Sequence, residues 1–252
     1  MYNLVDLSDK HVLITGASSG IGKEIAILIS KLGARVSLVG RNKDTLEKVI
    51  GQLEGNGHFL YEYDIADFTK IEYLISSVVE KSGTINGFVH SAGIEMTRPL
   101  KMLKVNHYKQ VFDINTISAL EITRYITKNN NISNGASIIF ISSIVGILGQ
   151  AGKTAYSASK GALIAASKCL ALELASKGVR VNTILPALVE TEMSAKILES
   201  LSEESKDNIL KMHPLGFGKA IDVANSAAFL LSSASKWITG VEFIIDGGYS
   251  AS

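Results

Sequence analysis

Three side chains between residues 142 and 160 have the types and spacing of an acid–base group. Tyr156 and Lys160 are four residues apart in the helix-forming run TAYSASKGALIAASK, so they share one face of the expected helix. Ser143 directly follows the apolar run 137–142, which has the composition of a strand. A neighbouring ammonium lowers the pKa of a tyrosine from its usual value of about 10. These residues are candidates for exchanging a proton with a carbonyl or hydroxyl oxygen that Ser143 holds.

A glycine-rich loop near the start of the chain predicts a phosphate-binding site. The run LITGASSGIG (13–22) joins an apolar strand-like segment to an amphipathic one. Its spacing, G-x-x-x-G-x-G, is a variant of the dinucleotide fingerprint, and the backbone N–H groups at a helix N-terminus favour a diphosphate. The candidate cofactor contacts in this loop are Gly16, Ser18, Ser19, Gly20, Ile21 and Gly22.

The same loop also matches G-x-S-x-G, the pattern of a nucleophile elbow. An elbow follows several strands, whereas only fifteen residues precede Gly16, where this pattern begins. Among the later histidines, only His213 stands in a plausible place, and no obvious acid partner precedes it. The dinucleotide interpretation is therefore favoured.

The end of the second expected strand indicates which dinucleotide is bound. An NAD site commonly carries an acidic residue there, but VSLVGRNK offers Gly40, Arg41 and Asn42. Because a guanidinium matches phosphate geometry, Arg41 and Asn42 predict NADP(H) in preference to NAD(H). The alternative is that Arg41 is an ordinary surface charge.

The order of elements predicts a Rossmann-like, doubly wound α/β fold: a seven-stranded parallel sheet flanked by helices, in a single domain over residues 1–252. The expected strands are 11–15, 35–39, 58–63, 87–91, 137–142, 180–185 and 242–246. The expected helices are 20–32, 43–53, 67–82, 106–128, 154–177, 192–211 and 221–232. Segment 188–216 contains Glu-rich helical pieces and no expected strand; it is either a substrate lid or a surface excursion.

Composition narrows the function classes. Of the 252 residues, 46% are hydrophobic. The formal net charge is only +1, which disfavours nucleic-acid and membrane partners. The single cysteine, Cys169, lies in an apolar helical run and is expected to be buried. With no secretory or membrane-spanning pattern, the expected location is the cytoplasm. No metal site is expected.

Together, these motifs resemble the classical short-chain dehydrogenases/reductases over essentially the whole chain. TGASSGIG, Ser142-Ser143, YSASK and the closing ITGVEFIIDGG stand where that family carries them. The resemblance implies a catalytic set of Asn115, Ser143, Tyr156 and Lys160, in which Asn115 supports a proton relay through Lys160 and water. It also implies that Tyr156 and Lys160 contact the cofactor, with Lys160 holding the nicotinamide ribose.

The resemblance also implies further cofactor contacts. Asp64 and Ile65 match an adenine-contacting pair, and Val189 and Thr191 match residues that hold the nicotinamide carboxamide. Where the family usually has Asn-Asn-Ala-Gly, this chain has His90-Ser91-Ala92-Gly93. The resemblance implies that Ala92 and Gly93 still allow the backbone to approach the cofactor closely.

Two departures from the family pattern leave questions. His90 is either an altered ribose contact or a structural histidine, and the latter is favoured. The usual Pro-Gly is Pro186-Ala187, which restricts the backbone slightly. Neither change removes a catalytic group.

Within the family, the pattern is most similar to 3-oxoacyl-[acyl-carrier-protein] reductases. This implies NADPH-dependent reduction of a ketone, with a substrate that a carrier protein could hold. A sugar, steroid or polyol dehydrogenase is the alternative within the family, and a non-catalytic dinucleotide-binding sensor is the alternative from another class. The family also implies a homo-oligomer, commonly a tetramer.

Overall fold

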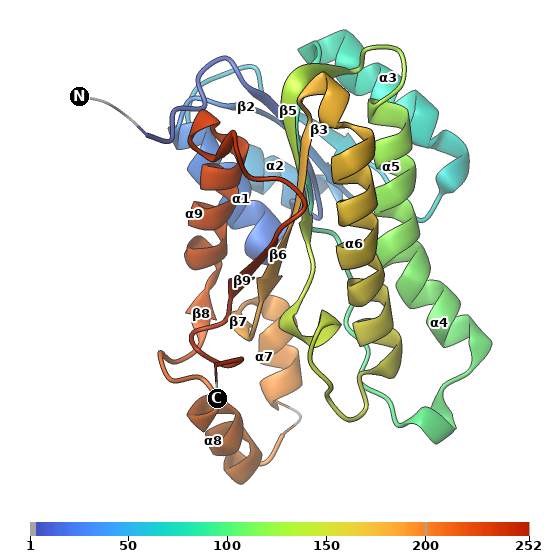
Figure 1. The fold of residues 1–252 in the computed structure, drawn as a ribbon, viewed down its shortest axis with the longest axis vertical. Coiled ribbons are helices and arrows are strands. Elements are labelled where there is room, and N and C mark those ends of the chain that lie inside the picture. Colours follow the sequence, from blue (N-terminus) through green and yellow to red (C-terminus); the bar gives the residue numbers. More distant parts are fainter. Residues whose placement is uncertain (1–3, 200, 252) are drawn as a thin grey trace.

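A parallel sheet of seven strands forms the centre of the computed structural model, which describes residues 4–199 and 201–251 (Figure 1). The strand order is β3-β2-β1-β4-β5-β6-β9. The strands are β1 (His11–Thr15), β2 (Arg35–Gly40), β3 (Phe59–Glu62), β4 (Ile85–His90), β5 (Ile132–Ile141), β6 (Arg180–Pro186) and β9 (Glu242–Ile245). The predicted doubly wound fold is confirmed.

The central strands are buried along their length because helices cover both faces of the sheet. Every residue of β1 and of β6 is buried, as the near-continuous apolar runs predict for parallel strands. Figure 1 shows the two helical layers on either side of the sheet. One layer comprises α1 (Gly20–Lys31), α2 (Lys43–Ile50) and α9 (Ala220–Leu231). The other comprises α3 (Ile71–Ser82), α5 (Ser118–Ile126) and α6 (Thr154–Glu173).

Two expected helices are subdivided. The expected helix 106–128 is α4 (Val105–Phe112), a π-helical turn at Asp113–Ile117, and α5. A π turn widens a helix by one residue, which hydrophobic spacing does not reveal, and such turns are frequent at functional sites. The expected helix 192–211 is α7 (Glu192–Glu199) and α8 (Glu203–Lys211). Short 3-10 turns lie at Phe68–Lys70, Leu100–Met102, Ile144–Gly146, Ala175–Lys177 and Ser233–Ser235.

The expectation that segment 188–216 contains no strand is wrong. Strand β7 (Val189–Glu190) pairs in parallel with β8 (Gly218–Lys219) as a separate two-stranded sheet. Two residues are too few to show an alternating pattern, so this pairing could not be predicted from the residues alone. The small sheet ties together the two ends of the segment that carries α7 and α8.

The expected burial of Cys169 is also wrong, because its side chain is exposed. The buried face of α6 carries Leu163, Ile164, Ser167 and Ala171. Cys169 is two positions from Ser167, about 200° around the helix, and therefore points away from the sheet. The outer face of α6 is also apolar, with Leu172 exposed, so composition did not distinguish the two faces.

The strand order places a topological switch point beside β1. From β1, strands β2 and β3 extend the sheet in one direction, whereas β4 and β5 extend it in the other. In such sheets, ligands bind in the crevice beyond the carboxyl ends of the strands. Helices α7 and α8 lie beyond the end of β6, at this edge of the sheet (Figure 1).

The packing of Phe88 against the layer of α3, α5 and α6 predicts that truncating this side chain strongly lowers stability. This side chain lies in β4 and is fully buried against the α3, α5 and α6 layer. We expect Phe88→Ala to lower the free energy of unfolding by about 3–5 kcal/mol. Tyr73→Ala, at a side chain that is 75% exposed, should change it by less than about 0.5 kcal/mol. Urea denaturation followed by circular dichroism measures both, and equal losses would contradict this assignment of the core.

Candidate active site

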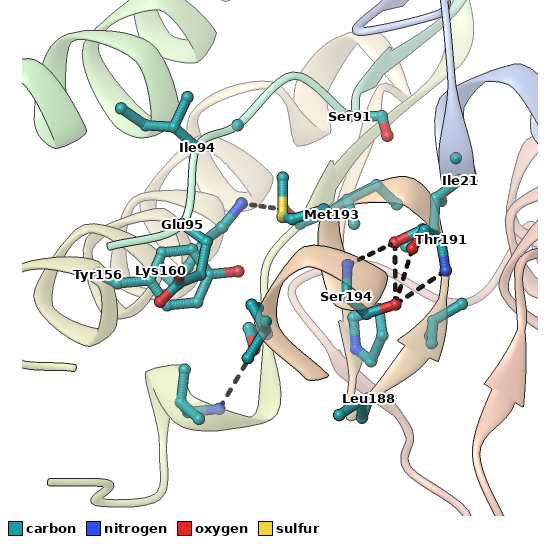
Figure 2. A pocket seen from close by; sticks show the side chains of 18 of the residues that line it. Ile21, Ser91, Ile94, Glu95, Tyr156, Lys160, Leu188, Thr191, Met193 and Ser194 are labelled. Carbon is teal, nitrogen blue, oxygen red and sulfur yellow. Dashed lines mark hydrogen bonds between the residues drawn. The ribbon is translucent and has the colours of Figure 1, made fainter. Parts of the chain in front are cut away.

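A cavity of about 860 Å³ opens at the carboxyl ends of the central strands. Its volume is near the upper end of the usual range for ligand pockets, about 300–1,000 Å³. Figure 2 shows Tyr156, Lys160 and Glu95 on one side and Thr191 and Ser194 on the other. Most of the site residues predicted from the sequence line it: Gly16, Ser18, Ser19, Gly20, Ile21, Arg41, Asp64, Ile65, Ala92, Gly93, Ser143, Tyr156, Lys160, Val189 and Thr191.

The glycine loop brings two backbone segments closer than any side chain would allow. Gly16 has a φ of 67°, and a Cβ there would lie 2.6 Å from the Cα of Ala92. A Cβ on Gly22 would lie 2.4 Å from the carbonyl oxygen of Gly16. Gly22 therefore packs against the backbone of Gly16, and it does not line the cavity.

The first turn of α1 presents backbone donors to this cavity. Ser19 is the N-cap residue, yet its side chain makes no capping hydrogen bond, and the first turn contains no acidic residue. The first N–H groups of a helix have no partner within the helix, and the helix dipole attracts an anion. The loop fits the diphosphate of a dinucleotide, with Ser18, Ser19, Gly20 and Ile21 facing the cavity.

The residues beyond β2 and β3 line the far end of the same cavity. Arg41 is exposed at its rim, whereas Asn42 caps α2 by accepting a hydrogen bond from the N–H of Thr45 at 2.9 Å. Asp64 accepts a hydrogen bond from the N–H of Ala66 at 3.1 Å. Asn42 therefore has a structural role and does not face the cavity.

Tyr156, Lys160 and Ser143 meet at the centre of the site. Lys160 is only 4% exposed, and its Nζ donates a hydrogen bond to the carbonyl oxygen of Ile141 at 2.8 Å. The same Nζ lies 5.8 Å from the centroid of the Tyr156 ring. Ser143 stands immediately after β5, where its Oγ accepts a hydrogen bond from the N–H of Val145 at 3.4 Å. The strand and the helix thus bring together the three side chains singled out by their spacing.

The electrostatics of this group differ from the expectation. Burial raises the pKa of Tyr156 to about 12; the Ser143 hydroxyl acts in the opposite direction, and the charge of Glu95 raises the pKa further. Burial also lowers the pKa of Lys160 to about 8. The predicted lowering of the Tyr156 pKa is therefore wrong in this structure, because desolvation of the phenolate outweighs the hydrogen bond with Ser143.

Asn115 braces the site from behind. It lies in the π-helical turn, is fully buried and does not line the cavity. Its Oδ1 accepts a hydrogen bond from the N–H of Ile94 at 2.8 Å, and its Nδ2 donates to the Ile94 carbonyl and to the Ser159 Oγ, each at 3.0 Å. A Cβ on Gly93 would lie 3.3 Å from both Asn115 Oδ1 and Lys160 Nζ. The Asn115 amide therefore fixes the loop that packs against Lys160.

His90 also lies outside the cavity. It is fully buried, and its Nδ1 forms a hydrogen bond with Thr15 Oγ1 at 2.9 Å across the β1–β4 pair. Burial, followed by the charge of Lys160, lowers the pKa of His90 to about 3, so the ring is neutral. This placement favours a structural role over contact with the ribose.

Sequence reasoning missed an ion pair in the cavity. Lys153 Nζ pairs with Glu95 Oε1, and the side chains are only 10% and 16% exposed. Thr97 Oγ1 donates a hydrogen bond to the same carboxylate oxygen at 2.6 Å. The partners are 58 residues apart, so spacing carried no signal; only the position of Glu95 soon after β4 pointed to the cavity.

The segment between β7 and β8 supplies apolar side chains to the cavity. The contributing residues are Met193, Ile197, Leu201, Ile209 and Met212. His213 lies at the end of this segment, with Nδ1 bonded to the Ile209 carbonyl at 2.7 Å and Nε2 accepting from the N–H of Leu188 at 3.4 Å. Both ring nitrogens are thus occupied by the backbone, which removes the nucleophile-elbow alternative.

Two further findings concern residues 4–199 and 201–251. No group of three or more His, Cys, Asp or Glu side chains is placed to hold a metal ion. No helix in this part of the chain is long and apolar enough to cross a membrane.

The lowered pKa of Lys160 predicts a pH dependence of stability. Because the pKa falls from 10.5 to about 8 on folding, the unfolded chain binds more protons between pH 8 and 10. The free energy of unfolding therefore rises with pH across this window, with about 2 kcal/mol due to Lys160. We expect Lys160→Met to lose this part of the rise and Lys177→Met, at an exposed lysine, to keep it. Urea denaturation at pH 8 and pH 10 measures the difference, and an unchanged rise in Lys160→Met would contradict the assignment.

Comparisons with known proteins find relatives over nearly the whole chain. A family model described as enoyl-(acyl carrier protein) reductase matches residues 16–250. The 3-oxoacyl-[acyl-carrier-protein] reductase of Thermotoga maritima is 35% identical over 245 residues, which are 96% of this chain and 98% of that protein. The protein of the same name from Rickettsia prowazekii is 35% identical over 246 residues, covering 97% and 98%.

Solved structures show the same architecture. A short-chain type dehydrogenase/reductase from Mycobacterium ulcerans has a TM-score of 0.90 and 31% identity, covering 98% of this chain and 91% of that chain. A dehydrogenase/reductase from Sinorhizobium meliloti has a TM-score of 0.90 and 30% identity, covering 97% and 96%. The chain therefore belongs to the short-chain dehydrogenase/reductase family and is an oxidoreductase that uses a nicotinamide dinucleotide.

Proposed function

We propose that the protein reduces a ketone with NADPH and that its substrate class is a 3-oxoacyl thioester. The observation that carries the reaction is the meeting of Tyr156, Lys160 and Ser143 in the cavity onto which the glycine loop opens. The substrate class is supported by relatives named 3-oxoacyl-[acyl-carrier-protein] reductase, which match nearly the whole chain.

The side chains divide the proton chemistry among them. Ser143 Oγ holds the substrate oxygen, and the Tyr156 hydroxyl donates its proton to that oxygen. A pKa of about 12 keeps this hydroxyl protonated at neutral pH, as a proton donor requires. Lys160, fixed by the Ile141 carbonyl, places its ammonium beside the ring and stabilises the phenolate that forms. The nicotinamide, when bound, supplies the hydride.

Other residues would hold the dinucleotide. The diphosphate would bind at the uncapped N-terminus of α1, against the cavity-lining residues Ser18, Ser19, Gly20 and Ile21. The adenine would contact Asp64 and Ile65, and the nicotinamide carboxamide would contact Val189 and Thr191; all four line the cavity. Asn115 acts through Ile94 and positions this wall.

Arg41 supports the preference for NADPH. It lines the rim of the cavity just after β2, at the place where an NAD site commonly carries an acid. An exposed guanidinium there can form two parallel hydrogen bonds with a 2′-phosphate.

The segment 188–216 would act as a substrate lid. Several of its side chains that line the cavity are apolar, such as Met193, Ile197 and Ile209, which suits an acyl chain. Residue 200 lies outside the described residues. A carrier protein as donor of the substrate, a homotetrameric assembly and a cytoplasmic location stay predictions. A non-catalytic sensor is disfavoured, since such a protein has no need to keep Ser143, Tyr156 and Lys160 together.

The proton donor can be tested by removing one oxygen atom. We expect Tyr156→Phe to lower the turnover of a short 3-oxoacyl thioester with NADPH at least 100-fold, because general acid catalysis contributes about 10²–10⁴-fold. Loss of NADPH absorbance measures turnover, and fluorescence titration checks that NADPH still binds. Near-normal turnover in the variant would overturn the assignment of Tyr156.

The cofactor preference can be tested at Arg41. We expect Arg41→Ala to raise the KM for NADPH about 10–100-fold, as expected for a lost charge-assisted hydrogen bond, and to leave the KM for NADH within about twofold. Lys43→Ala is the matched control, because Lys43 is an exposed cation nearby that does not line the cavity. Equal effects of Arg41→Ala on both cofactors would contradict a phosphate contact.

A further inference from the structure

The ion pair of Glu95 and Lys153 occupies the substrate side of the cavity. Glu95 lies on the loop after β4, and Lys153 immediately precedes α6, three residues before Tyr156. The Nζ of Lys153 is 5.9 Å from the centroid of the Tyr156 ring, and Figure 2 shows Glu95 beside Tyr156 and Lys160. Both residues line the cavity. The pair is therefore adjacent to the group that donates the proton.

Burying this ion pair is unfavourable for folding, so its presence calls for a functional reason. Removing two charges from water carries a large desolvation penalty, and an apolar pair of similar volume is often as stable. A network that only joined the two loops would not need charges, because the backbone N–H of Arg98 already donates to the Gly152 carbonyl at 2.7 Å. The charges thus point to a ligand.

The hydrogen bonds of the pair leave the ammonium with spare donors. Glu95 Oε1 accepts from both Lys153 Nζ and Thr97 Oγ1, which fixes the carboxylate and places the ammonium. An ammonium has three N–H donors. Among residues 4–199 and 201–251, its one hydrogen-bond partner is Glu95. The remaining donors are available to an acceptor oxygen, which the substrate can provide.

We propose that Lys153, held by Glu95, donates a hydrogen bond to a second carbonyl oxygen of the substrate, two carbons from the ketone that is reduced. This inference rests on the proposed function. A 3-oxoacyl thioester has its thioester oxygen at that position, and a simple ketone has none. The apolar side chains of the lid, such as Met193 and Ile209, then face the acyl chain. Lys153 thereby selects 1,3-dicarbonyl compounds.

The test compares two matched substrates. One is the N-acetylcysteamine thioester of 3-oxobutanoate, and the other is the keto thioether in which a CH2 replaces the thioester carbonyl. The ratio of kcat/KM between them, measured with NADPH, gives the preference for the second carbonyl. Differences in intrinsic reactivity cancel when this ratio is compared between variants.

The variants separate the ammonium from the carboxylate. Lys153→Met alone leaves a buried unpaired carboxylate, whereas the amide oxygen of Glu95→Gln can still accept a hydrogen bond from the ammonium. The informative pair is therefore Glu95→Gln and the double variant Glu95→Gln, Lys153→Met. Both lack the charge that Glu95 places near Tyr156, and only the first keeps the ammonium. We expect Glu95→Gln to keep the wild-type preference within about threefold and the double variant to lower it about 10–100-fold.

The outcomes distinguish this inference from the proposed function. A double variant that keeps the wild-type preference, or that loses turnover of both substrates equally, overturns the role of Lys153. If the wild-type protein reduces both compounds without preference, the reductase assignment stands and the inference fails. If it binds NADPH but reduces neither, both the proposed function and the inference fail.

Discussion

The close approach of two backbone segments at the switch point of the sheet is the constraint on which the site depends. Gly16 and Ala92 follow the neighbouring strands β1 and β4, and a single Cβ on Gly16 would force them apart. Their contact brings the N-terminus of α1 into the same cavity as the loop that carries Glu95. Below this contact, Thr15 and His90 join the same two strands by a buried hydrogen bond.

Burial of charge is the second organising feature. Lys160 is held by one backbone carbonyl and by packing against Gly93 and Tyr156, so its ammonium is poorly solvated and its pKa falls. The same desolvation keeps the Tyr156 proton in place. In the proposed reaction, Tyr156 would keep its proton until the substrate oxygen develops negative charge, and the ammonium of Lys160 would then stabilise the phenolate that forms.

Features that depend on residues close together in the sequence could be predicted from it. The strands were evident because parallel strands buried on both faces are apolar throughout, and the Tyr156–Lys160 spacing fixes a shared helical face whatever surrounds it. Features that depend on distant segments were missed. The Glu95–Lys153 pair joins residues 58 positions apart, the π-helical turn at Asn115 leaves no mark on hydrophobic spacing, and the Tyr156 pKa depends on burial that composition cannot show.

The departures from the family motif also follow from packing. The histidine at position 90 forms a hydrogen bond with Thr15, because its Nδ1 reaches the hydroxyl across the β1–β4 register. The larger ring is accommodated in the core only in its neutral form, which the desolvated surroundings enforce. Substitution at this position therefore changes the interior that supports the cavity wall and leaves the lining itself, Ala92 and Gly93, unchanged. Glu95 and Lys153, by contrast, line the cavity beside Tyr156, so a substitution of either residue would alter the lining directly.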